Sequence, residues 1–218
     1  MVKSSTMKPL KAVPQLLLWL AVPAIASNHA PPPVQPAASF AAVEVHEDEK
    51  IAIAAEPYDT PEKEAIFRVD YLSYGVMPIR VIITNNGDRP ISLLEAWITF
   101  ITATGDKIHI AELADVERVM NSKDREDGKT KAPKTKPLPK ASKRELDADF
   151  STFEFRALVV KPRSTYAGFL FYDVSGLEHP LEGAKLRLRT LHDAHGAELL
   201  DFDIPFDKYL KSKSGQAN

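Results

Sequence analysis

From residue 51 to residue 204, apolar side chains recur at every second position in short runs that are separated by turns. In the clearest run, Ile79, Val81 and Ile83 share one side of the chain, and the residues that follow, 85–88, read Asn-Asn-Gly-Asp. Successive side chains of a β-strand point to opposite faces, so a period of two is typical of a strand with one buried face. Asn and Gly tolerate the positive φ of a tight turn. The alternation therefore predicts a domain built from short strands.

The same alternation places the other strands and their faces. Residues 79–111 are expected to form a β-meander, in which Leu94 points into the core, and Leu200 is expected to point inward near the end of the chain. Residues 166–174 are apolar on both faces, which is typical of a central strand. The expected strands are residues 51–55, 67–71, 79–84, 94–102, 107–111, 155–161, 166–174, 185–189 and 199–204.

Two further local patterns predict ion pairs and helices. Lysine and arginine alternate along residues 185–189, and aspartates alternate along residues 199–204, so we expect cross-strand ion pairs if these strands are neighbours. Thr60 and Pro61 are the residue types that favour a helix start, as an N-cap and a first-turn proline. A second short helix is expected over residues 112–120.

Eight or nine strands, few helical segments and no regular strand–helix alternation predict an all-β fold, an antiparallel immunoglobulin-like β-sandwich. Residues 78–93 (PIRVIITNNGDRPISL), the Gly-Asp turn at 105–106 and residues 168–174 (GFLFYDV) resemble the exported bacterial immunoglobulin-like domains that are sometimes called telokin-like. The resemblance covers residues 49–206 and implies no catalytic motif. This chain departs from those domains in its long insertion after Met120 and in having no lipobox cysteine.

Residues 1–26 have the three parts of a signal peptide. A segment with three lysines precedes an apolar stretch at residues 13–22, and Ala24-Ile25-Ala26 is a cleavage site of the small-x-small type. The apolar stretch is too short to cross a hydrocarbon layer of about 30 Å as a helix. We therefore expect cleavage after Ala26 and a secreted or periplasmic protein, with an uncleaved N-terminal anchor as the alternative. The chain has no cysteine, so neither disulfides nor a lipid-modified cysteine can form.

Composition divides the rest of the chain. Residues 27–48 are rich in proline and alanine and are expected to be a spacer, residues 49–210 a single domain, and residues 211–218 a disordered tail. Residues 122–145 are expected to be a flexible insertion, because their lysines repel one another and their prolines interrupt helices and strands. This insertion is either an electrostatic arm for anionic lipid, cell-wall polymer or nucleic acid, or a solvated loop without a partner. Its candidate binding residues are Lys129, Lys131, Lys134, Lys136, Lys140, Lys143 and Arg144.

Catalytic motifs are scarce. The chain has no Gly-x-Ser-x-Gly motif, no glycine-rich phosphate loop and no thiol nucleophile, so we expect neither enzymatic activity nor a cofactor. The alternative is a metal-assisted hydrolase that uses His192, His195, Asp201, Asp203 and Asp207 around the last hairpin. The net charge of -2 is not that of a dedicated nucleic-acid binder.

Trp97 is the best single candidate for a binding anchor. It lies in the solvent-side register of its predicted strand, and tryptophan is enriched among the residues that dominate binding energy at interfaces. The alternative is a Trp97 that is covered by the inserted helix. The sequence therefore predicts a non-enzymatic interaction module for a protein or an anionic envelope polymer, without specifying its ligand or its oligomeric state.

Overall fold

The computed structural model describes residues 29–127 and 141–216. The predicted signal peptide and the five insertion lysines from Lys129 to Lys140 lie outside these ranges. The strands are β1 (Val43–His46), β2 (Ile51–Pro57), β3 (Val76–Asn85), β4 (Ile91–Ser92), β5 (Trp97–Ile101), β6 (Lys107–Ile108), β7 (Val159–Val160), β8 (Ser164–Asp173), β9 (Lys185–Arg189) and β10 (Phe202–Pro205). The helices are α1 (Pro61–Glu64), α2 (Leu113–Asp127), α3 (Lys143–Phe153) and α4 (Asp207–Gln216), with single 3-10 turns η1 (Ala37–Ser39) and η2 (Leu72–Tyr74).

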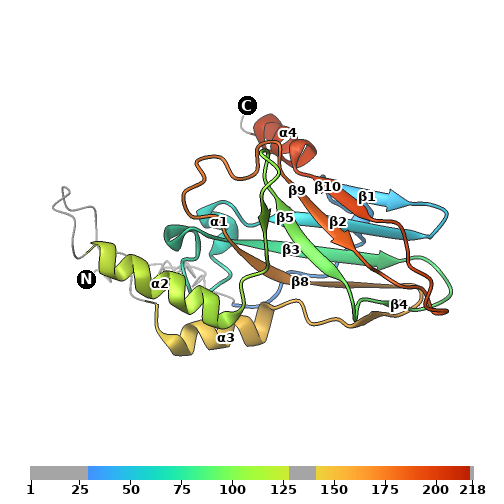
Figure 1. Ribbon diagram of the computed structural model, residues 1–218, viewed down its shortest axis with the longest axis horizontal. Helices are drawn as coiled ribbons and strands as arrows, with labels where there is room; N and C mark the ends of the chain where they lie inside the picture. The colour runs from blue at the N-terminus through green and yellow to red at the C-terminus, as the bar shows by residue number, and fades with distance from the viewer. Residues whose placement is uncertain (1–28, 128–140, 217–218) are drawn as a thin grey trace, which may run out of the picture.

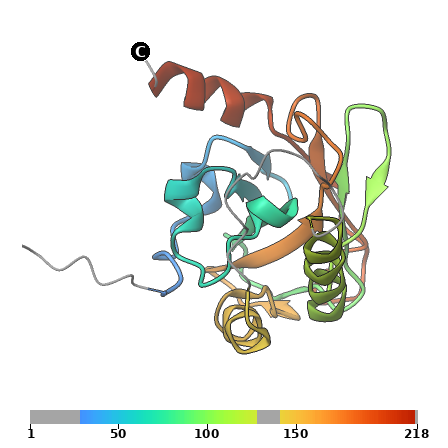
Figure 2. The same ribbon diagram turned by 90° about the vertical axis from the view of Figure 1, so that its left-hand side faces the viewer.

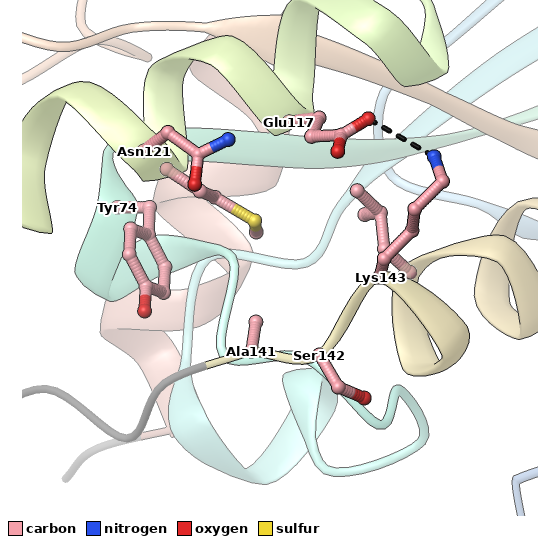
Figure 3. Close-up of a pocket in the computed structure, with 8 residues that line it drawn as sticks. Tyr74, Glu117, Asn121, Ala141, Ser142 and Lys143 are labelled. Carbon is pink, nitrogen blue, oxygen red and sulfur yellow. Dashed lines mark hydrogen bonds and ion pairs between the residues drawn. The ribbon is translucent and has the colours of Figure 1, made fainter.

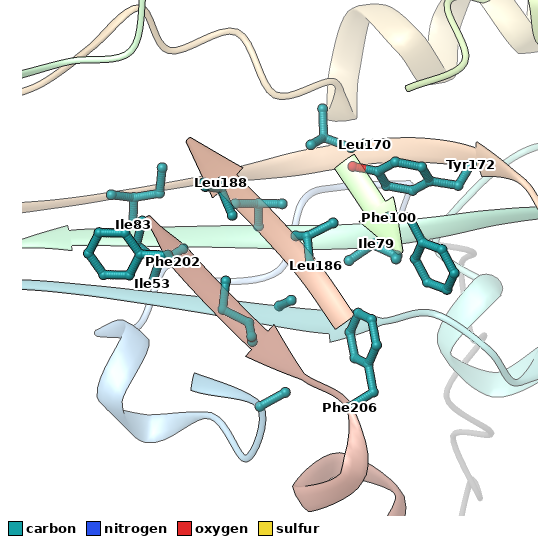
Figure 4. Packing of buried hydrophobic residues seen from close by; sticks show 14 of the residues in the cluster. Ile53, Ile79, Ile83, Phe100, Leu170, Tyr172, Leu186, Leu188, Phe202 and Phe206 are labelled. Carbon is teal, nitrogen blue, oxygen red and sulfur yellow. The ribbon is translucent and has the colours of Figure 1, made fainter. Parts of the chain in front are cut away.

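Two four-stranded antiparallel sheets pack face to face (Figure 1). The first sheet has the strand order β1-β2-β3-β8, and the second has the order β10-β9-β5-β6. Alternate side chains of both sheets point into one apolar core between them (Figure 4). The predicted antiparallel β-sandwich is therefore confirmed. Labelled core residues in Figure 4 are Ile53, Ile79, Ile83, Phe100, Leu170, Tyr172, Leu186, Leu188, Phe202 and Phe206.

A layer formed by α2, α3 and residues 58–74 covers the other face of the first sheet (Figures 1 and 2). Phe169 and Phe171 of β8 pack into this layer, whereas Leu170 and Tyr172 pack into the sandwich. The prediction that this strand is central was wrong, because β8 lies at one end of the hydrogen-bonded order. Its two apolar faces are explained by the helices, which provide a second surface against which the strand is buried.

Residues 67–71 alternate like a strand but form a loop. The fully buried carboxylate of Asp149, on α3, accepts hydrogen bonds from the backbone N–H groups of Arg68 at 2.9 Å and of Val69 at 3.1 Å. The Arg68 guanidinium donates to the same carboxylate at 3.0 Å. A side chain of a distant helix thus binds backbone groups that would otherwise need a neighbouring strand, so this strand prediction was wrong.

Three other strand predictions also need correction. β3 and β5 belong to different sheets, so of the expected meander only the β5–β6 hairpin forms. The side-chain amide of Asn85 donates to backbone carbonyls just before β4 and in β7, and the chain crosses to the second sheet after this point.

Leu94 and Leu200 are 70% and 68% exposed, because both precede the first residue of their strand. The strand expected at 155–161 is reduced to β7.

The spacer prediction for residues 27–48 was wrong from the first prolines onward. The buried Arg80 donates to the backbone carbonyls of Pro32 and Pro33, both at 2.9 Å. Ala37 is fully buried, its N–H donates to a threonine hydroxyl of β3, and β1 pairs with β2. An extended proline segment makes no hydrogen bonds of its own, so its free carbonyls are available to a buried guanidinium.

The flexible insertion predicted for residues 122–145 was wrong at both ends. α2 continues to Asp127, and α3 begins at Lys143 behind a capping box in which the Ser142 hydroxyl accepts from the N–H of Glu145 and the Glu145 carboxylate accepts from the N–H of Ser142. Such a box satisfies N–H groups that a helix start leaves free. Two of the expected arm residues, Lys143 and Arg144, therefore belong to a helix.

The disordered tail predicted for residues 211–218 was wrong through residue 216, where α4 ends. Tyr209 of α4 is 8% exposed and donates its hydroxyl hydrogen to Asp59, and Lys213 forms an ion pair with the same carboxylate at 2.8 Å. These contacts attach the helix to the loop before α1. A sequence pattern of lysine and serine does not reveal this attachment, because the partner lies far away in the chain.

Candidate functional site

The outer face of the second sheet carries an ordered set of polar side chains. Leu186 and Leu188 of β9 are fully buried, so the alternate residues Lys185, Arg187 and Arg189 face away from the core. The register places Trp97 of β5 opposite Arg189, and the next outward residues along the two strands are likewise opposite each other. The two-residue period that builds the core thus also builds this face.

A shallow groove of about 350 Å³ runs across this face. It joins side chains from β5, β6 and β9, and from the residue after β9, which are distant in the sequence. Among the described residues that line it, none is acidic. The lining residues are Trp97, Thr99, Ile101, Lys107, His109, Arg187, Arg189 and Thr190.

The arginines of the groove are held from the side by two carboxylates, one in β10 and one just before it. Two nitrogens of the Arg187 guanidinium bond the two oxygens of Asp203 at 2.6 and 2.7 Å, and Arg189 lies 3.2 Å from Asp201. Hydrogen bonds from Arg187 lower the pKa of Asp203 to about 2, and the same contact raises the pKa of Arg187. The predicted cross-strand ion pairs are confirmed, and they orient both guanidinium groups beside the groove.

The opposite side of the groove is positively charged and free of such pairing. Lys107 and His109 are exposed, and within residues 29–127 and 141–216 neither forms an ion pair or a side-chain hydrogen bond. The lysine therefore contributes uncompensated positive charge, and the imidazole contributes a hydrogen-bonding group. A bound anion would meet both without displacing an existing partner.

Trp97 is 64% exposed at one end of this groove. The interpretation in which a helix covers it was wrong, because α2 packs on the other side of the first sheet. At the same end Thr190 has a φ of 58°, in the left-handed region. A β-branched residue is rarely found there and costs on the order of 1–3 kcal/mol, and such strain is concentrated at functional sites.

A second hollow lies between α2 and α3, beside Tyr74 (Figure 3). Lys143 spans it and pairs with Glu117 of α2 at 3.1 Å. Since Lys143 joins two helices, it serves the packing of the helix layer, and among the described residues that line this hollow none is another predicted site residue. Arg144 is exposed on α3.

The residues of the alternative metal site are dispersed. His192 pairs its backbone with Ser92 and has Glu95 at 3.9 Å, whereas the His195 ring contacts Arg89. Asp203 is engaged by Arg187, as described above. Among the described residues, no three histidine, aspartate or glutamate side chains are grouped as a bound metal ion would require.

Sequence reasoning found Trp97 but missed the rest of the groove. For Arg187 and Arg189 the available signal was the alternation of charged and apolar residues along 185–189, which predicts a solvent-exposed strand face. Lys107 and His109 carry no signal beyond their alternation with apolar neighbours. Only the pairing β9-β5-β6 brings these four side chains to the same face as Trp97.

Comparisons with protein-family models, with curated proteins and with solved structures found no match to this chain. Across the part of the chain that the structure describes, no helix is long and apolar enough to cross a membrane.

Proposed function

We propose that this protein is an exported, non-enzymatic binding module that holds a protein or an envelope polymer on the Trp97 groove. The main observation behind the proposal is the exposed indole of Trp97, which is 64% exposed and lies outside the core. Covering this apolar surface with a partner would remove it from water and stabilise the complex. The oriented arginines beside it supply the polar contacts that fix a partner in one position.

The sandwich is proposed to be of the immunoglobulin-like type, in keeping with the resemblance of residues 78–93 and 168–174 to exported bacterial domains of that kind. Modules of this class bind through sheet faces or end loops and leave the core for stability. Export is proposed from the leader at residues 1–26. N-terminal sequencing of the protein recovered from the periplasm should begin at Ser27, and recovery of the unprocessed chain from the cytoplasm would contradict export.

The binding proposal is tested by capture from the cell-envelope fraction with the immobilised mature protein. Trp97→Ala should lose most of the captured material, because truncating an aromatic anchor of an interface costs about 2 kcal/mol or more. Leu177→Ala is the matched control, since Leu177 is an exposed apolar residue in the loop after β8, outside the groove lining. Equal capture by wild type and Trp97→Ala would refute the groove as the binding surface.

A further inference from the structure

We propose that the ligand of the Trp97 groove is an acidic polysaccharide whose charge is carried by carboxylates, as in a chain of uronic acids. This inference rests on the proposed function and adds the chemical class of the ligand. Three properties of the groove support it: the exposed aromatic ring of Trp97, the free threonine hydroxyl groups, and the placement of Lys107, the one unpaired cation among the described lining residues.

The aromatic ring and the hydroxyl groups fit a sugar. The indole of Trp97 provides a flat apolar surface at one end of the groove, and the C–H face of a pyranose ring packs against such a surface. Thr99 and Thr190 also line the groove, and within the described residues neither hydroxyl has a hydrogen-bond partner. Hydroxyl groups of a sugar can donate to and accept from both threonines.

The cations fit a polymer with widely spaced negative charges. Lys107 is the one lysine of the lining, and Arg189 is exposed enough to reach a second carboxylate while it remains beside Asp201. A nucleic-acid duplex carries one charge per about 1.7 Å and is bound by rows of free lysine and arginine. The described residues of the groove form no such row, because both arginines are already paired, Arg187 with Asp203 of β10 and Arg189 with Asp201 just before β10.

The position of the groove disfavours an acidic peptide. An extended peptide binds a sheet by adding a strand to an edge, where backbone groups are free. The groove instead lies on the face of this sheet, where β5 bonds β9 on one side and β6 on the other, so among these three strands only the edge strand β6 has free backbone groups. Apart from Trp97 its one apolar lining residue is Ile101, which is 8% exposed and offers no pocket for a peptide side chain.

The test compares oligogalacturonate with its methyl ester, which keeps the sugar ring and removes the charge. The mature protein should bind oligogalacturonate in titration calorimetry, with an affinity that falls as salt is added. The methyl ester should bind at least about tenfold more weakly, since each tenfold step equals about 1.4 kcal/mol. Equal affinity for the two oligomers would overturn the inference.

Two variants and one competitor locate the contacts. Trp97→Ala and Lys107→Gln should each weaken oligogalacturonate binding by about fivefold or more, whereas Leu177→Ala should bind as wild type does. Poly-L-glutamate at the same carboxylate concentration should not displace the sugar. Displacement by poly-L-glutamate, or unchanged binding by Trp97→Ala, would overturn the inference.

Failure of this inference is distinguishable from failure of the proposed function. If Trp97→Ala loses the captured envelope material while wild type does not bind oligogalacturonate, the ligand class is wrong and the binding surface stands. If Trp97→Ala captures as wild type does, the surface itself is wrong and both proposals fall.

Discussion

Glu64 should make the stability of this protein fall as the pH rises from about 4.5 to about 7. Its side chain is 7% exposed at the end of α1, where its carboxylate accepts a hydrogen bond from the N–H of Leu72 at 2.7 Å. Burial, with a smaller effect of the nearby Asp70, raises its pKa from 4.5 to about 7, although the hydrogen bond from Leu72 acts in the opposite direction. At a pH between 4.5 and about 7, the folded protein therefore holds a proton on Glu64 that the unfolded chain has released.

The sign and the size of the effect follow from this difference. Between pH 4.5 and about 7 the folded state binds more protons than the unfolded state, so the free energy of unfolding decreases as the pH rises. Each pKa unit is worth about 1.4 kcal/mol, which sets an upper bound of about 3.5 kcal/mol for the whole window. Below pH 4.5 the side chain is neutral in both states and this loss is absent.

Glu64→Gln keeps the shape of the side chain and removes its titration. The amide oxygen can still accept from Leu72, and the amide nitrogen can donate to Asp70 as the protonated carboxyl does. Urea unfolding should show nearly equal stability of variant and wild type at about pH 4, and a gain of about 1–3 kcal/mol for the variant at pH 8.5.

Glu62 provides the matched control because it lies on the same helix and is exposed. Glu62→Gln should show no gain in stability at pH 8.5. If the stability curves of Glu64→Gln and wild type run parallel from about pH 4 to pH 8.5, the carboxyl of Glu64 titrates alike in both states and the reasoning is wrong.

Three further substitutions test the packing. In Gly168→Ala the new Cβ would lie 2.6 Å from the Cα of Phe155, so urea unfolding should show a loss of about 1–3 kcal/mol; an unchanged midpoint would contradict the contact. Tyr172→Phe should stabilise by about 1 kcal/mol, because its buried hydroxyl has no hydrogen-bond partner among the described residues, and a loss instead would reveal a partner. Arg80→Ala should increase amide exchange in residues 31–40 and leave β9 protected; unchanged exchange there would show that other contacts hold the segment.

The local patterns were reliable for β2, β3 and β9, where the prediction depended only on alternation between the two faces of a strand. β2, β3 and β9 were predicted from their alternation, and Thr60 caps α1 through a hydrogen bond to the N–H of Lys63, as its residue type indicates. The ion pairs between β9 and β10 followed from opposite charges in matching registers. These features depend on neighbours along the chain or in the next strand.

The patterns failed where a distant group replaced the expected partner. Asp149 binds the backbone of a loop that alternates like a strand, and Arg80 binds proline carbonyls that were expected to be solvated. Both partners are buried charged side chains that lie far away in the chain from the backbone groups they bind. A sequence shows that such a side chain exists but does not show which backbone group satisfies it.

The sequence by itself determined the alternating core residues of β2, β3 and β9, because burial of alternate apolar side chains needs only the period of a strand. It also indicated the exposed side of Trp97. The tertiary structure alone decided the strand order β10-β9-β5-β6, which places Arg189 on one side of the indole strand and Lys107 on the other. The groove depends on that order because pairing between strands distant in the chain is chosen by the packing of the whole core, which no local pattern encodes.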